Sequence, residues 1–64
     1  MAHSTTAELT VTADHIARYR ERITGLVPPL VGHDHDDAIA AIFEAERALR
    51  TAHRALERAA KLLG

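Results

Sequence analysis

The chain has 64 residues, a formal net charge of −1 and no cysteine. This length allows one small domain, and the lack of cysteine excludes disulfides and zinc sites with thiolate ligands. The near-neutral charge and the content of one Tyr, one Phe and no Trp argue against a strongly basic or base-stacking nucleic-acid surface. Because so short a chain buries little of its own surface, we expect self-association to supply part of its stability.

The N-terminal segment, residues 1–7, is small and polar and shows no hydrophobic period. We expect it to be a flexible end, with a single helical-hairpin domain in residues 8–64. It lacks the basic start and apolar core of a secretory signal, and no apolar run approaches the ~20 residues that span a bilayer. These features predict a soluble, cytoplasmic protein without a membrane partner.

Residues 8–12 alternate between polar and apolar side chains, with Leu9 and Val11 as the apolar members. This pattern is typical of a short strand or of an extended segment leading into a helix. In a third interpretation, Thr5 caps an earlier helix and Glu8 completes a capping box. Three consecutive β-branched residues favour the extended interpretations.

A first helix is predicted over residues 13–27, with Thr12 as its N-cap. Its apolar residues recur three and four positions apart, so they share one face. They are Ile16, Tyr19, Ile23, Leu26 and Leu30. Pro28 and Pro29 remove amide donors and disfavour the helical conformation just before them, so the helix should end near Val27.

A second helix is predicted over residues 35–63, after an acidic turn at residues 32–37. Asp34 is its predicted N-cap, and Asp36 and Asp37 then favour the positive end of the helix dipole. The helix repeats every seven residues. One column holds Ile42, Leu49, Leu56 and Leu63, and two neighbouring columns hold Ala38, Ala45, Ala52, Ala59 and Ala41, Ala48, Ala55, Leu62.

These patterns predict an all-α fold, an antiparallel two-helix hairpin that dimerises into a four-helix bundle. The heptad period favours a crossing angle near 20°, and the small residues allow close helix contact. The apolar stripe of the second helix is wider than one neighbouring helix needs. The predicted oligomer interface comprises Ile16, Tyr19, Ile23, Leu26, Ile42, Ala45, Leu49, Ala52, Leu56, Ala59 and Leu63.

Two groups of side chains suggest ligand chemistry. His33, His35 and Asp36 are the residue types that bind zinc, nickel or copper, although a solvated, turn-forming cap is the favoured interpretation. Glu46 and His53, seven residues apart, are predicted to make hydrogen bonds at the flank of the apolar stripe. The second helix also carries a basic face of the kind that suits phosphates or an acidic partner, although such a face is more typical of a solvated helix surface. It consists of Arg47, Arg50, Arg54, Arg58 and Lys61.

The segment Leu9-Thr10-Val11-Thr12 and the helix through Tyr19 to Gly25 resemble the ribbon-helix-helix repressors. The resemblance implies a strand-helix-helix regulator that binds DNA. Three features depart from that family: the Pro-Pro and acidic segment between the helices, the long second helix, and a strand without basic or amide side chains to read bases. We therefore assign no family on sequence.

The sequence shows no nucleophile-base pair and no glycine-rich phosphate loop, so we expect neither an enzyme nor a cofactor. The predicted function is a small interaction or assembly module that self-associates and has an unidentified protein partner. A small DNA-binding regulator is the alternative, although nucleic acid is not an expected partner, and a metal-binding helical bundle is the second alternative.

Overall fold

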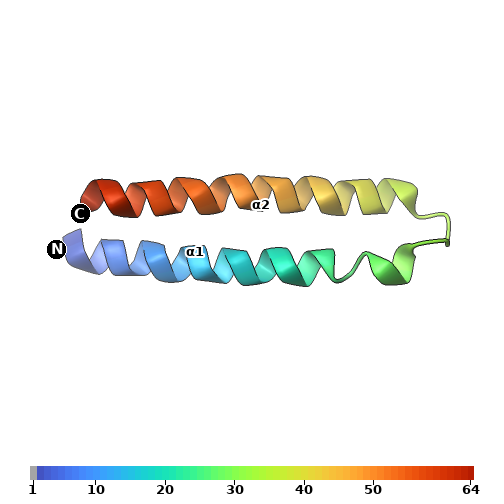
Figure 1. Ribbon diagram of the computed structural model, residues 1–64, viewed down its shortest axis with the longest axis horizontal. Coiled ribbons are helices and arrows are strands. Elements are labelled where there is room, and N and C mark those ends of the chain that lie inside the picture. Colours follow the sequence, from blue (N-terminus) through green and yellow to red (C-terminus); the bar gives the residue numbers. More distant parts are fainter. Residues whose placement is uncertain (1) are drawn as a thin grey trace.

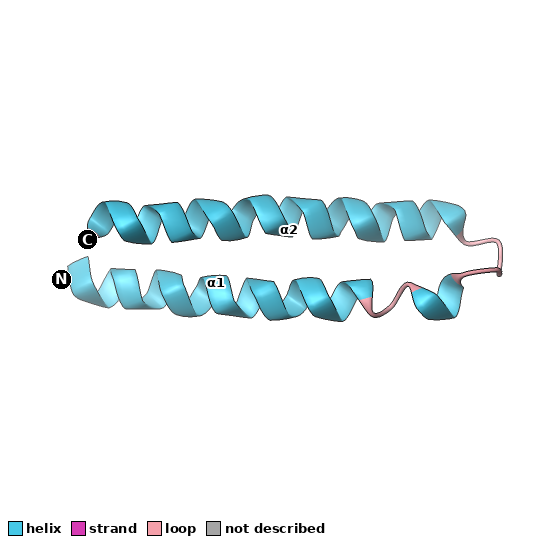
Figure 2. Cartoon of the chain, viewed as in Figure 1, coloured by secondary structure: helices cyan, strands magenta, loops and turns pink. Residues whose placement is uncertain are grey.

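The computed structural model describes residues 2–64 as two long antiparallel helices (Figure 1). Helix α1 spans Ala2–Thr24, a short 3-10 helix η1 spans Pro28–Leu30, and α2 spans Asp36–Leu63. The start of α1 and the end of α2 lie together at one end of the hairpin, and the connection between the helices lies at the other. Within residues 2–64 there is no strand (Figure 2). The predicted all-α hairpin is confirmed.

Helix α1 begins at Ala2, so the expected extended or strand segment at residues 8–12 is wrong. Residues 2–7, expected to precede the domain, are helical as well; Met1 lies outside the described residues. The hydroxyl of Thr12 donates to the carbonyl oxygen of Glu8 at 2.7 Å, and that of Thr10 bonds Thr6 in the same way. Thr12 is therefore an interior helical residue and not an N-cap.

Packing against α2 explains why this β-branched stretch is helical. Thr6, Leu9, Ala13 and Ile16 follow one another at spacings of three and four, and all four are at least partly buried. This period extends the stripe of α1 back to the start of the chain. Tertiary packing of one face outweighs the weak preference of threonine and valine for strands.

Helix α1 ends at Thr24, three residues before the predicted end. The amide of Gly25 still bonds Glu21, and the chain then turns into η1. Pro28 and Pro29 occupy the first positions of η1, where a missing amide costs no helical hydrogen bond. The prolines therefore begin η1 and also prevent α1 from continuing.

The loop before α2 contains two left-handed residues, Gly32 at φ 83° and Asp34 at φ 63°. The N-cap position of α2 belongs to His35, which makes no side-chain capping bond. Asp34 is therefore not the N-cap predicted from sequence. Asp36 and Asp37 do lie in the first turn, where their charge complements the helix dipole.

The two helices meet along a single seam rather than around a closed core. The seam positions of α1 are Thr6, Leu9, Ala13, Ile16, Arg20 and Ile23, and Val27 and Leu30 continue the seam after the helix has ended; on α2 they are Ile39, Ile42, Glu46, Leu49, His53, Leu56 and Ala60. Among the described residues, only Ala13 and Val27 are buried hydrophobic residues. Because every spacing is three or four, the seam has coiled-coil periodicity.

The hairpin is long and thin. It measures 50 × 14 × 11 Å and has a radius of gyration of 15.1 Å, against about 11 Å for a compact chain of this length. Its accessible surface is 4979 Å², whereas a folded monomer of the same mass exposes about 4,000 Å². None of the helices within residues 2–64 combines the length and the apolar character that a membrane crossing requires.

Candidate interaction surface

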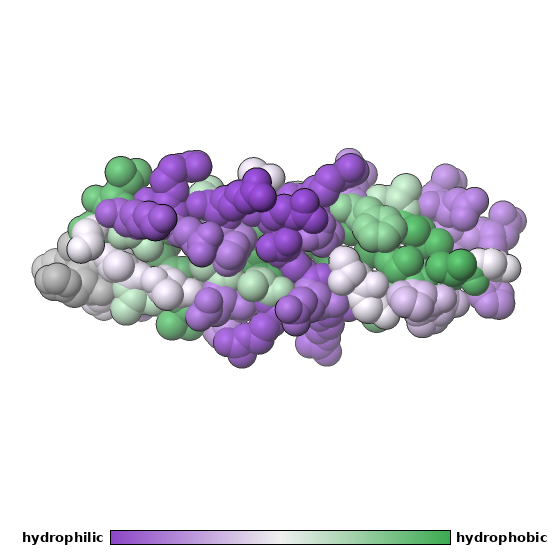
Figure 3. All heavy atoms as spheres, in the orientation of Figure 1, coloured by the Kyte–Doolittle hydropathy of each residue, from purple (hydrophilic) through white to green (hydrophobic). Residues whose placement is uncertain are grey.

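The hairpin has two distinct sides, and a surface hollow that both helices line identifies the first of them. Thr10 and Asp14 of α1 line this hollow together with Glu57 and Lys61 of α2, so these four residues share one side of the seam. We call it the polar side. Figure 3 shows a face of the molecule on which hydrophilic side chains cover the middle of both helices and hydrophobic ones gather towards the loop.

Helical geometry identifies the residues that lie on the opposite side of the seam. At 3.6 residues per turn, Tyr19 and Leu26 lie across α1 from Thr10 and Asp14. On α2, the two small-residue columns lie across the helix from Glu57. We call this the alanine side, and it comprises Thr5, Thr12, Tyr19 and Leu26 of α1 with Ala38, Ala41, Ala45, Ala48, Ala52, Ala55, Ala59 and Leu62 of α2.

The alanine side is open to solvent over most of its length. Leu62 is 82% exposed, Leu26 57% and Tyr19 55%. Ala48 and Ala55 are exposed as well, whereas Ala52 and Ala59 are half-buried beside the seam. Small side chains leave the backbone of α2 accessible, so another helix can approach it closely.

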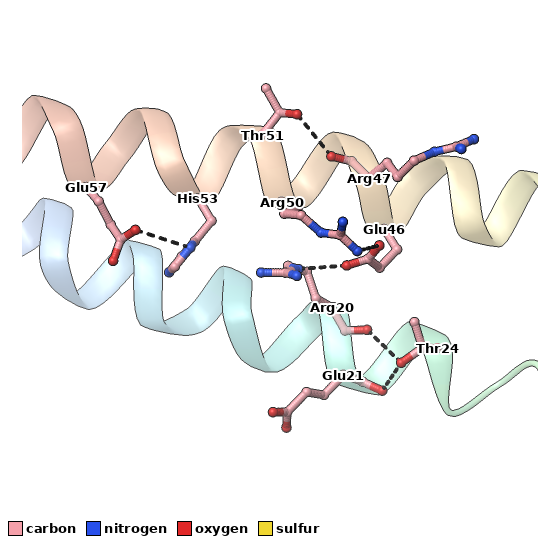
Figure 4. Close-up of polar contacts among 9 residues, drawn as sticks. All are labelled: Arg20, Glu21, Thr24, Glu46, Arg47, Arg50, Thr51, His53 and Glu57. Atoms are coloured by element: carbon pink, nitrogen blue, oxygen red, sulfur yellow. Dashed lines mark hydrogen bonds and ion pairs between the residues drawn. The ribbon is translucent and has the colours of Figure 1, made fainter.

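The seam contains a charged cluster at its middle (Figure 4). The Nε of Arg20 donates to Glu46 Oε2 at 2.9 Å, and the Nη2 of Arg50 donates to Glu46 Oε1 at 2.8 Å. Glu46 is buried, at 7% exposure, so its carboxylate lies between the helices with both oxygens bonded. Arg20 links α1 to α2, and Arg50 braces the same carboxylate from one turn further along α2.

These bonds stabilise the ionised form of Glu46. The hydrogen bond from Arg20 is the main cause that lowers the pKa of Glu46 below its ordinary value of 4.5. Burial acts in the opposite direction, and the hydrogen bond and charge of Arg50 outweigh it together with Arg20. The carboxylate therefore stays charged at neutral pH and holds both guanidinium groups.

Glu46 and His53 both lie in the seam rather than at the flank where the sequence pattern placed them. His53 Nδ1 is 3.6 Å from Glu57 Oε1, a long contact at the polar edge of the seam. Polar residues in these positions interrupt the apolar column of α2, which begins with Ile39 and ends with Ala60. The hydrophobic pattern alone therefore assigned that column to the margin.

The structure divides the predicted oligomer interface into two groups. Ile16, Ile23, Ile42, Leu49 and Leu56 lie in the seam and are half-buried by the other helix of the same chain. Tyr19, Leu26, Ala45 and Leu63 are exposed, and Ala52 and Ala59 are half-buried. The second group is the part that remains open to a partner.

The histidine-rich loop gathers no metal site among the described residues. His35 and Asp36 line an open hollow with Asp34 and Asp37, and His33 is not part of it. Among the side chains that the structure describes, those of residues 4–64, no three His, Cys, Asp or Glu come together in a group that suits a metal ion. The loop instead provides the turn and the acidic start of α2.

The basic residues of α2 do not act as one free surface. Arg50 is committed to Glu46, while Arg47, Arg54, Arg58 and Lys61 are exposed. The strand that a ribbon-helix-helix repressor would insert into DNA is absent from residues 2–64, because residues 8–12 are helical. The strand-helix-helix interpretation is therefore wrong for this chain.

A second hollow, on the outer surface of α1, was not predicted from the sequence. His15, Arg18, Tyr19 and Arg22 line it, and each of these side chains can donate a hydrogen bond. Their spacings of three and four were the available signal, since that spacing places residues on one helix face. Tyr19 is shared between this hollow and the alanine side.

Comparison of the chain with family models, with curated proteins and with solved structures finds no match.

Proposed function

We propose that this protein is a small, non-enzymatic assembly module, and that two hairpins associate through their alanine sides into a four-helix bundle. The observation that carries the proposal is the surface left uncovered by the hairpin. Its 4979 Å² exceeds the surface expected for its mass by roughly 1,000 Å². That excess is close to the ~800 Å² that each partner contributes to a stable protein interface.

The composition of the alanine side supports a second hairpin as its partner. Tyr19, Leu26 and Leu62 are large apolar side chains left more than half exposed, and alanines fill the space between them. Covering each large side chain is worth about 1.5–3 kcal/mol at full burial. A second hairpin offers the same small, flat surface in return, as a two-fold dimer requires. A chain without cysteine also fits our proposal of a cytoplasmic location.

The test is the mass of the purified protein in solution, measured by light scattering or sedimentation equilibrium at micromolar concentration. The expected mass is twice the 7.0 kDa of one chain. Ala48→Glu places a carboxylate on the alanine side at a position that the hairpin leaves exposed. We expect it to raise the dimer Kd by more than tenfold, because the two-fold buries the new charge twice.

The matched control is Ala40→Glu, which makes the same change at an exposed position outside the alanine columns. Both variants should retain the helical circular dichroism of the hairpin, because neither alanine is buried in the seam. A wild-type mass of one chain, or equal weakening by both substitutions, would contradict the proposal.

A further inference from the structure

We propose that the hollow on the outer surface of α1 binds the phosphoryl group of a phosphate monoester. This hollow has a volume of about 260 Å³ and is lined by His15, Arg18, Tyr19 and Arg22. Pockets that enclose a whole small molecule measure about 300–1,000 Å³, so this one suits a single charged group. Because all four residues belong to one helix, such binding does not depend on self-association.

Helical geometry brings the four side chains together. Positions 15, 18, 19 and 22 are three and four residues apart, so they are neighbours on one face of α1. Long side chains on a helix lean towards its N-terminus. The side chain of Arg22 therefore extends over the turn that contains Tyr19, and that of Arg18 extends over the turn that contains His15. The hollow thus gathers donors from successive turns of the helix.

The two guanidinium groups carry charge that the chain does not compensate. Arg18 and Arg22 are four residues apart, and like charges at this spacing destabilise a helix. In the described part of the chain neither makes an ion pair, whereas Arg20 of the same helix is bonded to Glu46. A bound anion removes the repulsion between them. A local cost of this kind is expected at a functional site.

The nearest carboxylates of α1 line other hollows. Asp14 is four residues before Arg18, but it lines the hollow on the polar side. Glu21 precedes Arg22, but it lines a hollow beside Glu46. Among the described residues, those that line the proposed site are therefore cations and neutral donors, without a carboxylate.

The number and charge of these donors favour a phosphoryl group over a carboxylate. A phosphate monoester offers a charge of about −1.5 to −2 and three acceptor oxygens, which match two guanidinium groups. Each guanidinium can bind two of the oxygens as a fork, and the imidazole N–H and the phenol O–H are further donors. A carboxylate has one charge and two oxygens, so a single arginine already neutralises it and pairs with both oxygens.

Helix α2 contains the same arginine spacing without the other two donors. Arg54 and Arg58 are exposed and four residues apart, but Thr51 and Ala55 take the places of the histidine and the tyrosine. This pair has the same charge as the pair in the hollow. It is therefore an internal control for binding that depends on charge alone.

The site stays accessible in the proposed bundle. Tyr19 lies on the alanine side, whereas Arg22 and Arg18 lie about 60° and 100° further round α1, away from the seam. A second hairpin on the alanine side therefore leaves both guanidinium groups open to solvent. Phosphoryl binding and self-association can be measured separately.

The test is a titration of the full chain with glycerol 3-phosphate at constant ionic strength, followed by heteronuclear NMR. The side-chain Nε–H signals of Arg18 and Arg22 should shift and saturate, while those of Arg54 and Arg58 should move little. Acetate, titrated in the same way, represents a carboxylate ligand. It should bind about tenfold more weakly, because it has fewer oxygens and less charge.

Substitutions identify the donors. Arg22→Gln should weaken the binding of glycerol 3-phosphate at least about tenfold, because a hydrogen bond between charged groups is lost. Arg58→Gln makes the same change in the control pair and should leave the Kd within about twofold of the wild type. Arg22→Lys keeps the charge but not the fork, so its Kd should lie between those of Arg22→Gln and the wild type.

Tyr19→Phe removes only the phenol hydroxyl and keeps the aromatic ring on the alanine side. It should weaken the binding of glycerol 3-phosphate about threefold, as expected for the loss of one neutral hydrogen bond. The mass of the protein in solution should not change, because the ring is the part that a second hairpin covers. This variant therefore separates the ligand site from the proposed interface.

A second probe identifies the source of the phosphoryl group. Phosphatidic acid carries the same phosphate monoester on a membrane surface, so phosphatidylcholine vesicles with and without it are sedimented with the chain. Saturable binding of glycerol 3-phosphate indicates a small soluble ligand. Binding only to vesicles that contain phosphatidic acid, lost in Arg22→Gln, indicates a lipid headgroup. Either result supports the site.

Three results would overturn it: acetate that binds as tightly as glycerol 3-phosphate, equal weakening by Arg22→Gln and Arg58→Gln, or no saturable binding of either phosphate source. The first would instead indicate an acidic partner, and the second an effect of charge alone. None of these readouts depends on the mass of the protein in solution. Failure here therefore leaves the proposed self-association standing, and a monomeric chain leaves this site standing.

Discussion

At the scale of single residues, Glu46 is the one buried charged residue in the described part of the chain. Its two oxygens accept from Arg20 and Arg50 inside a seam that is otherwise largely apolar. Replacing one member of such a group leaves the others as charges without a partner, which costs more than the intact group gains. The cluster therefore fixes which residues of α1 and α2 lie opposite each other.

This environment predicts a pH dependence. The pKa of Glu46 is lower in the folded chain than its ordinary value of 4.5. Its contribution to stability is therefore complete above pH 4.5 and is lost as the pH falls from there through the lower, folded-state pKa. Glu46→Gln should be less stable than the wild type at pH 7, and the difference in the free energy of unfolding should be smaller at pH 3, as measured by urea unfolding followed by circular dichroism.

The control for this prediction is Glu21→Gln, which removes an exposed carboxylate whose side chain takes no part in the seam cluster. Its stability should follow that of the wild type at both pH values within a few tenths of a kcal/mol. If the difference between wild type and Glu46→Gln is as large at pH 3 as at pH 7, Glu46 acts through its shape rather than its charge.

At the scale of the elements, the connection between the helices contains two glycines with different roles. A methyl group on Gly25 would meet only backbone oxygens at 3.4 and 3.5 Å, an ordinary contact distance. Gly32 has φ 83°, where any other L-residue is strained. Asp34, at φ 63°, already bears that strain.

These conformations predict opposite effects of alanine in the same loop. Gly25→Ala should raise the free energy of unfolding by about 0.4–1 kcal/mol, because alanine restricts the unfolded chain. Gly32→Ala should lower it by about 1 kcal/mol, and Asp34→Gly should relieve strain in the folded loop. Denaturant unfolding of the three variants measures the signs; stabilisation by Gly32→Ala would show that the left-handed turn is not retained.

The long helices differ in how well sequence predicted them. The second helix was placed within one residue of its true start because its heptad columns are continuous and mostly apolar. The first was recognised only from residue 13, because Thr6 and Arg20 are polar members of its seam and Thr10, Val11 and Thr12 imitate a strand. Hydrophobic periodicity identifies a stripe only when its positions are apolar.

The candidate surface was predictable to the same extent. The alanine columns and the exposed Tyr19 and Leu26 were identified from spacing alone. The leucine column was assigned to the oligomer, whereas α1 covers it within the chain. Helical period shows that a face is apolar, but it does not show which neighbour covers it until both helices have been placed.

At the scale of the whole molecule, stability and association are linked. Among the described residues the seam buries only two hydrophobic side chains completely enough to count as a core. A folded chain with so little interior gains much of its stability from any partner that covers its open side. Binding that occurs only in the folded state stabilises that state by mass action.

The thermal midpoint should therefore rise with protein concentration. For a dimer that unfolds to separate chains, each tenfold increase in concentration above the Kd adds about 1.4 kcal/mol per dimer. For a domain of this size, that free energy corresponds to a shift of several degrees.

Wild type should show this rise in the thermal midpoint in scans from micromolar to millimolar protein. Ala48→Glu should start from a lower midpoint and show almost no rise until the concentration exceeds its weakened Kd, while Ala40→Glu should parallel the wild type. A wild-type midpoint that does not change with concentration would mean that the seam alone holds the hairpin together, despite the surface that it leaves uncovered.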